Sequence, residues 1–236
     1  MDTVLAGRLG EIRARIQAAA ARSGRESSDV RLMAVTKTHP REMVLAARGA
    51  GLRVFGENRV AEAAEKYMDT PADAELHLIG HLQTNKAKQA AALFSWVDSI
   101  DCLHTARALN TRLAPLQKDM NILLELNTSG EDSKSGYRTF DDLETDLEEM
   151  LLLPRLKLRG LMTVGPLTGD AGQIRAAFRH LRICLDRLRR LTPADCRLDT
   201  LSMGMSGDFE IAVEEGANLI RLGTILFGKR ESRCAE

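Results

Sequence analysis

Short apolar segments recur along the chain, and longer amphipathic segments separate them. Eight of the short segments are expected strands, at residues 30–36, 52–56, 76–79, 96–100, 122–126, 158–164, 198–203 and 219–223. Most are apolar at both alternating sets of positions, which is typical of strands covered on both faces. The pattern predicts a parallel sheet whose strands are joined by helices.

Two of the intervening segments show clear helical periodicity. Residues 5–19 place apolar side chains on one stripe, and this helix is expected to end near Ser23 and Gly24. Residues 170–191 predict a second amphipathic helix, in which an apolar stripe lies opposite a row of arginines. The arginines of this row are Arg175, Arg179, Arg182, Arg187 and Arg189.

Eight strand–helix units in 236 residues match a closed (β/α)₈ barrel, the TIM barrel, better than an open doubly wound sheet. No Gly-x-Gly-x-x-Gly stretch follows the first strand, which argues against a Rossmann domain. No Pro-, Gly- or Ser-rich linker interrupts the pattern. We therefore expect one domain over residues 1–236.

Charge and composition narrow the class of protein. The 33 basic and 33 acidic residues cancel, so no global positive field favours nucleic acid. The arginine row resembles a nucleic-acid face, but a solvated helix surface is the better interpretation. With no signal peptide, no membrane-length apolar run and no CxxC pair, we expect a cytoplasmic protein with reduced thiols. The cysteines are Cys102, Cys184, Cys196 and Cys234.

The first candidate for chemistry is Lys37, at the end of the first expected strand. In this fold, functional groups sit at the carboxyl ends of the strands. Lys37 directly follows an apolar run, which would partly desolvate its ammonium. Desolvation lowers the pKa of a lysine and favours the neutral amine that forms Schiff bases. Taken alone, however, a lysine after a strand is usually a solvated loop residue.

The second candidate feature is the pair of turns after the last two strands. The small-residue turn at 202–208 leads into a helix, and Ser206 occupies the position expected for its N-cap. Gly223 and Thr224 form another turn at the end of the last strand. Loops at these positions commonly hold phosphate in this fold. Ordinary capping explains the turns equally well, but combined with Lys37 they indicate a phosphorylated aldehyde.

Other polar residues carry weaker signals. His77, His81 and His104 have no standard metal-ligand spacing and no evident carboxylate or cysteine partner, so core or loop histidines are expected and no metal is predicted. Residues 133–136 follow the fifth strand. They could act as a lid, although most such loops only connect elements.

Several blocks of the sequence, taken in order, resemble the pyridoxal phosphate homeostasis proteins (the YggS/PROSC type). The blocks are AVTKT at 34–38, FGEN at 55–58, HLIGHLQ at 77–83, SID at 99–101, SKSG at 133–136, GLMT at 160–163, LSMGMS at 201–206 and RLGT at 221–224. The ordered set is highly specific and spans almost the whole chain. Departures are small: Thr36 stands where serine is common, His39 where lysine is frequent, and Leu78 where phenylalanine is usual.

The resemblance implies a barrel like the N-terminal domain of alanine racemase, with pyridoxal 5′-phosphate (PLP) held as a Schiff base on Lys37. It also implies that Arg221 faces the pyridine nitrogen. Members of this family are regarded as carriers and regulators of PLP in vitamin B6 homeostasis, without an established reaction. Apo-PLP enzymes are candidate recipients.

The resemblance further implies which residues surround PLP. The phosphate would be held by Ser206, Gly223 and Thr224, and Asn58 and Ser202 would lie close to the cofactor. None of the departures from the family pattern removes one of these contacts.

An amino-acid racemase of the alanine-racemase type is the main alternative. Racemisation needs two positioned acid/base groups, and such enzymes supply a tyrosine from a second domain. Here Tyr67 and Tyr137 fall in the barrel's own connections, which leaves Lys37 alone. Arg221 would also keep the pyridine nitrogen unprotonated and weaken the electron sink. We therefore expect a monomer that binds, stores or delivers PLP without efficient catalysis; an arginine-rich binding module is a third class.

Overall fold

The computed structural model describes residues 2–67, 73–131 and 133–228, and its eight parallel strands close into one barrel. The strands follow each other around the barrel in chain order, and β8 pairs with β1. They are β1 Arg31–Val35, β2 Val54–Glu57, β3 Glu75–Leu78, β4 Trp96–Ile100, β5 Met120–Glu125, β6 Leu156–Met162, β7 Thr200–Ser202 and β8 Leu219–Leu222. The predicted (β/α)₈ barrel is confirmed, with each strand end within two residues of its expected position.

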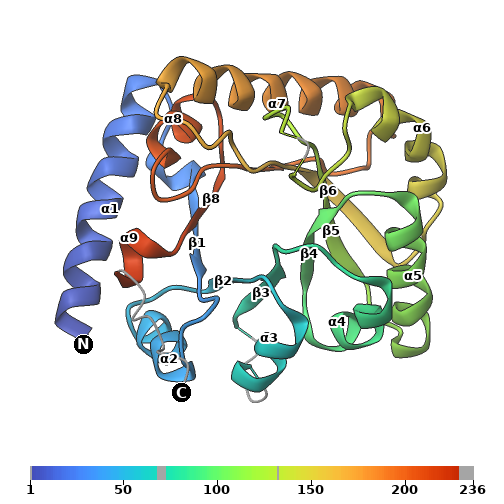
Figure 1. Ribbon diagram of the computed structural model, residues 1–236, viewed down its shortest axis with the longest axis horizontal. Coiled ribbons are helices and arrows are strands. Elements are labelled where there is room, and N and C mark those ends of the chain that lie inside the picture. The colour runs from blue at the N-terminus through green and yellow to red at the C-terminus, as the bar shows by residue number, and fades with distance from the viewer. Residues whose placement is uncertain (1, 68–72, 132, 229–236) are drawn as a thin grey trace.

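Helices surround the barrel on all sides (Figure 1). They are α1 Asp2–Arg22, α2 Arg41–Gly49, α3 Val60–Lys66, α4 Ala87–Leu93, α5 Leu103–Leu113, α6 Phe140–Leu151, α7 Ala171–Leu191, α8 Phe209–Glu214 and α9 Thr224–Phe227. The predicted helices near the N-terminus and over 170–191 are confirmed as α1 and α7. Asp170 caps α7, because its Oδ1 accepts hydrogen bonds from the N–H groups of Gly172 and Gln173.

The apolar core has two parts. The larger part lies between the strands and the helices, and the smaller part is inside the barrel, where two separate clusters form. The clusters are Met33, Val35, Val54 and Leu219, and Trp96, Leu123 and Met162. Asp98 and Arg221 follow Trp96 and Leu219 by two positions, so the alternation of a strand turns them inward as well. The barrel interior therefore combines apolar packing with buried charge.

Helix α1 connects the beginning of the described chain to its end. It lies beside α8 and α9 (Figure 1), and Arg15 and Arg22 form ion pairs with Glu210 and Glu214 at 2.9 and 2.7 Å. Just after α1, the guanidinium of Arg25 donates to two backbone carbonyls, one at the end of α8 and one beyond it, both at 2.8 Å. The helix thus stabilises the last strand–helix units.

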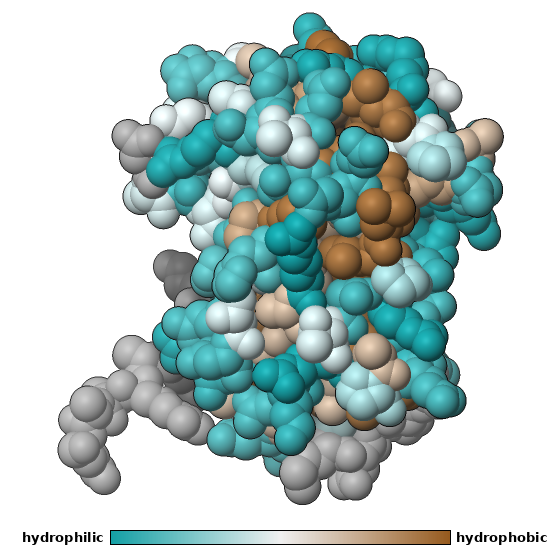
Figure 2. All heavy atoms as spheres, turned by 90° about the vertical axis from the view of Figure 1, so that its right-hand side faces the viewer, coloured by the Kyte–Doolittle hydropathy of each residue, from teal (hydrophilic) through white to brown (hydrophobic). Residues whose placement is uncertain are grey.

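The side of the molecule that carries α4 to α6 is mostly hydrophilic, with a band of apolar side chains in the upper half of the view (Figure 2). Leu116 and Leu152, which follow α5 and α6, are 49% and 75% exposed. Among the described helices, none has both the length and the apolar character that crossing a membrane requires.

Candidate functional site

Lys37 follows β1 directly, at the carboxyl end of the barrel, and is half-buried. Because β1 pairs with β8, the turn after β8 lies next to it. A Cβ added to Gly223 would be only 3.3 Å from the carbonyl oxygen of Val35. Beyond the lysine, the rings of His39 and Phe227 lie 5.0 Å apart. The segment that carries Lys37 and the turn at 223–224 are therefore side by side.

A buried network fixes the backbone just before Lys37. The Thr36 hydroxyl donates to Glu57 Oε1 at 2.7 Å, and Lys66 Nζ donates to the Thr36 carbonyl oxygen at 2.7 Å and to Glu57 Oε1 at 3.0 Å. Since the hydroxyl proton of Thr36 is engaged, Tyr67 is the donor in their 2.7 Å hydrogen bond. Burial raises the pKa of Glu57, and Thr36 and Lys66 oppose this shift. Sequence reasoning missed this network.

The residue after Lys37 is held in an uncommon conformation. Thr38 has a φ of 65°, in the left-handed region that residues other than glycine rarely adopt. Its N–H donates to the carboxylate of Glu62, which also accepts from Lys66 at 2.5 Å. Lys37 therefore sits between two anchored neighbours, and the tertiary contacts stabilise the strained turn.

The turn after β7 is joined to the turn after β8 through Ser206. The expectation that Ser206 caps the following helix was wrong: Asp208 occupies the N-cap of α8. The carboxylate of Asp208 accepts a hydrogen bond from the N–H of Met205 at 2.6 Å and closes the turn that precedes the helix. The Ser206 hydroxyl instead accepts from the N–H of Ile225, in the first turn of α9, at 3.3 Å.

This pair of turns has the features of an anion cradle. Gly204 has a φ of 94°, and a Cβ there would lie 2.5 Å from the Cβ of Ala212, so only glycine fits the turn. Gly223 precedes α9, whose first N–H groups, beginning with Thr224, have no partners within their own helix. A hydroxyl and such N–H groups are ligands that suit a phosphate. The donor set present here therefore fits the phosphate of PLP.

Arg221 is almost fully buried in the barrel, with 4% of its surface exposed. Its guanidinium donates from Nη1 to Ser202 Oγ at 2.7 Å and from Nη2 to the Thr163 carbonyl oxygen at 2.6 Å. Burial lowers the pKa of Arg221, and three carboxylates oppose that shift. They are Asp98, Glu125 and Asp208. The arginine is a fixed cation two residues before Gly223 of the cradle, where it can donate to a ring nitrogen.

Asn58 completes the rim on the other side of β1. It is half-buried after β2, and a side chain on Gly80 would collide with its carbonyl oxygen, so the next loop packs closely on it. The seven predicted residues, Lys37, Asn58, Ser202, Ser206, Arg221, Gly223 and Thr224, all lie at or near the carboxyl ends of β1, β2, β7 and β8. Their roles toward PLP stay predictions.

Glu125, at the end of β5, is a second residue that sequence reasoning missed. It is 6% exposed, and burial raises its pKa to about 7, with Arg221 opposing and Asp101 and Asp98 reinforcing the shift. A carboxyl inside an otherwise apolar strand was the available signal.

The Glu125→Gln variant is expected to change how stability depends on pH. In the wild type the folded chain holds the Glu125 proton to about pH 7 and the unfolded chain only to about pH 4.5, so stability falls as the pH rises between them. The loss is about 2.5 kcal/mol from roughly pH 5 to pH 8, and the variant lacks it. Urea unfolding of both proteins at the two pH values measures the difference. The same pH dependence in both proteins would refute the assignment.

The histidines have carboxylate partners that were not evident in the sequence. His77 Nδ1 lies 2.8 Å from Asp98, with both side chains fully buried, and His81 Nδ1 lies 2.8 Å from Asp101. Burial would lower the pKa of His77, but Asp98 and Glu75 raise it overall. The partners are about twenty residues apart and meet because β3 and β4 are neighbours. In the ranges that the structure describes, no group of three or more His, Cys, Asp or Glu could hold a metal.

The loop at 133–136 is tied to the loop after β6. Lys134 Nζ donates to Glu131 Oε1 at 2.6 Å and to the Gly165 carbonyl oxygen at 2.7 Å. The hydroxyls of Thr128 and Thr163 lie 3.0 Å apart and form a second link between the two loops. The idea that this loop is a lid stays a prediction; the contacts show that it is anchored in this structure.

Comparison with known proteins shows the family of this chain. Residues 8–231 match the family described as alanine racemase, N-terminal domain. A pyridoxal phosphate homeostasis protein of Pseudomonas aeruginosa is 42% identical over 231 residues, which cover 97% of each chain. The chain belongs to the pyridoxal phosphate homeostasis protein family. The Escherichia coli (strain K12) member of this family is 38% identical over 234 residues.

Solved structures agree with membership of the homeostasis family. The structure of PipY from Synechococcus elongatus PCC7942, with PLP bound, is 36% identical, has a TM-score of 0.82 and covers 95% of this chain and 100% of its own. An alanine racemase of Clostridium difficile 630 is 15% identical with a TM-score of 0.72, and 53% of that enzyme is covered. The racemase likeness shows the shared barrel and nothing beyond it.

Proposed function

We propose that this chain binds PLP covalently at Lys37 and carries or regulates the cofactor in vitamin B6 homeostasis, without efficient turnover. The observation that carries the proposal is the close approach of the Lys37 segment to the turn at Gly223, which Ser206 joins from β7. An amine and an anion cradle on one rim suit a phosphorylated aldehyde. The family names and the PLP bound in PipY support the same ligand.

Each part of PLP has a residue to receive it. Lys37 Nζ forms the covalent attachment, and the Ser206 hydroxyl and the N–H groups at Gly223 and Thr224 bind the phosphate. Bound PLP supplies an electron sink. Arg221 donates to the pyridine nitrogen and, as a permanent cation, opposes its protonation.

The positions of the two tyrosines support the proposal that this chain does not catalyse racemisation efficiently. The Tyr67 hydroxyl is hydrogen-bonded to Thr36, and the Tyr137 hydroxyl donates to Asp146 at 2.9 Å. Both side chains are buried, and burial raises the pKa of each phenol. A phenol that is buried and hydrogen-bonded in this way is poorly placed to exchange protons with a substrate. We therefore propose that neither tyrosine supplies the second acid/base group that racemisation needs.

The arginine row of α7 does not form the free basic face that a nucleic-acid module needs. Arg175 pairs with Glu214 and Glu215 at 2.5 and 2.9 Å, and Arg179 and Arg182 pair with Glu215 at 3.1 and 3.6 Å. Arg187 pairs with Asp141 and Glu144 of α6, and Arg189 pairs with Asp186 within α7, so the half-exposed row is electrically compensated along its length. The third alternative, an arginine-rich binding module, is accordingly not favoured.

We further infer a cytoplasmic, monomeric protein made of one domain over residues 1–236. The free thiols of Cys102, Cys184 and Cys196 support a reducing compartment. Cys234 lies outside the described residues.

A transfer assay tests the proposal. Protein loaded with PLP and freed of excess cofactor is mixed with the apo form of a PLP-dependent enzyme, and the recovery of that enzyme's activity is followed. We expect recovery faster than a dialysis membrane between the two proteins allows. In parallel, L- and D-alanine are added to the loaded protein and chirality is measured; turnover of about 1 per second or faster would replace the carrier by a racemase.

A further inference from the structure

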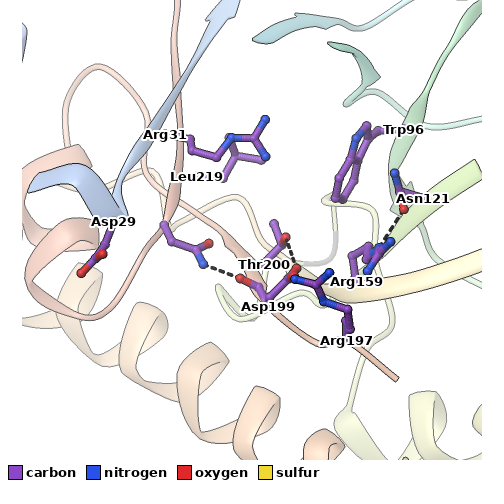
Figure 3. A pocket seen from close by; sticks show the side chains of 10 residues that line it. Asp29, Arg31, Trp96, Asn121, Arg159, Arg197, Asp199, Thr200 and Leu219 are labelled. Atoms are coloured by element: carbon purple, nitrogen blue, oxygen red, sulfur yellow. Dashed lines mark hydrogen bonds and ion pairs between the residues drawn. The ribbon is translucent and has the colours of Figure 1, made fainter. Parts of the chain in front are cut away.

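A cavity of about 360 Å³ opens at the amino-terminal ends of the strands. Arg31, Trp96, Thr200 and Leu219 line it, and each is the first residue of its strand (Figure 3). Lys37 follows the opposite, carboxyl end of β1, so the cavity is separate from the proposed PLP site. Its volume falls in the range of small-molecule sites, roughly 300–1,000 Å³.

Arg159, on β6, gives the cavity a cation with spare donors. Its Nε donates to Asn121 Oδ1 at 2.8 Å, the contact drawn in Figure 3. Within the described ranges, no carboxylate lies at ion-pair distance from it. Arg31, in contrast, is paired with Glu75 at 2.7 Å. The terminal N–H groups of Arg159 are thus available for an anion, and a guanidinium binds a carboxylate through two parallel hydrogen bonds.

The charge of the lining limits how negative a ligand can be. Asp29 and Asp199 also line the cavity, and Arg197 lies 3.7 Å from Asp199. Glu75 pairs with Arg31 and Asp199 lies closest to Arg197, which leaves Arg159 as the cation to receive a ligand. A singly charged anion matches this single cation, whereas the two aspartates would repel a doubly charged phosphate.

Trp96 supplies a rigid apolar wall. Its indole is stacked on His77, with ring centroids 4.8 Å apart and planes 12° from parallel, and Asp98 holds the imidazole in turn. The side chain is 7% exposed and lines the cavity together with Leu219. A fixed aromatic surface beside an apolar one favours a flat, apolar group.

We propose that this cavity binds a small monocarboxylate with a flat apolar body, whose carboxylate pairs with Arg159 and whose body contacts Trp96 and Leu219. The proposal does not depend on PLP, because the site lies at the other end of the barrel. It gives the chain a ligand site besides that of the cofactor.

Trp96 is the only tryptophan of the chain, so its fluorescence reports on the cavity directly. The purified full chain is titrated with benzoate and, as a matched control, with benzylamine, which has the same ring and the opposite charge. We expect a saturable change in emission with benzoate, with a dissociation constant of about 1 mM or lower, and none with benzylamine. No saturation, or an equal response to both compounds, would overturn the proposal.

Two variants test whether the carboxylate of benzoate binds at Arg159. Arg159→Met should weaken benzoate at least tenfold, and Asn121→Asp should do the same by placing a carboxylate beside Arg159. Asn121→Asp keeps the arginine and gains an ion pair, so it tests the site even where Arg159→Met fails to fold. Lys37→Ala should leave the titration unchanged. Unaltered benzoate affinity in folded Asn121→Asp would contradict the assignment.

Discussion

Lys37→Ala is expected to abolish the covalent capture of PLP. The wild type, incubated with PLP and reduced with borohydride, should gain the mass of one cofactor, and the variant should gain none. In the proposed binding mode the anion cradle holds the phosphate close to the Lys37 amine, so the reaction of this amine is effectively intramolecular. Intact mass spectrometry and the yellow colour before reduction measure the difference.

Lys88→Ala is the matched control for this experiment. Lys88 is an exposed lysine in the first turn of α4 and lies on none of the segments that carry the proposed cofactor contacts, so its loss should leave capture intact. Non-covalent PLP can remain on Lys37→Ala through the phosphate cradle, and gel filtration before reduction separates that fraction. One full equivalent still captured by Lys37→Ala would disprove the attachment at this residue.

Lys66→Met is expected to destabilise the fold by about 4 kcal/mol. Glu57 is fully buried, and Lys66, with 9% of its side chain exposed, is its cationic partner. Removing one member of a buried pair leaves the other charge uncompensated, which typically costs about 3–5 kcal/mol. Urea denaturation monitored by circular dichroism gives the free energy of unfolding.

The double variant Glu57→Gln/Lys66→Met separates the lost charge from lost packing. It should recover more than half of the loss, because no carboxylate remains to be buried alone. The exposed control Lys88→Met should change stability by no more than about 0.5 kcal/mol. A loss below about 1 kcal/mol in Lys66→Met would mean that Glu57 is protonated in the folded chain.

The fold could be predicted because its signal is local. Each strand is a short run of apolar residues, and the run is nearly continuous because both faces of the strand are buried. The polar residues that follow each run mark the carboxyl end of the barrel. Strand limits shifted by one or two residues because they depend on pairing between neighbours. The N-cap of the helix after β7 was assigned to Ser206 instead of Asp208, because both residue types are good caps and only the turn geometry selects between them.

The sequence predicted which segments form the candidate site, but it did not predict the buried contacts that hold these segments in place. Lys37 and Gly223 belong to motifs that can be read along the chain. The contact of Thr36 with Tyr67 joins positions 31 residues apart and depends on how α3 packs on β2. Charged residues inside apolar strands, such as Asp98 and Glu125, were the signal that something polar was buried there.

The docking of α1 has a consequence for synthesis on the ribosome. The helix is made long before its partners α8 and α9, and β1 must also wait for β8 to pair on one edge. At about 5–20 residues per second, its apolar stripe stays uncovered for roughly 10–50 s. The ring can therefore close only after β8 has been made, and a nascent chain stalled before residue 209 would present an open sheet edge and a bare amphipathic helix to chaperones.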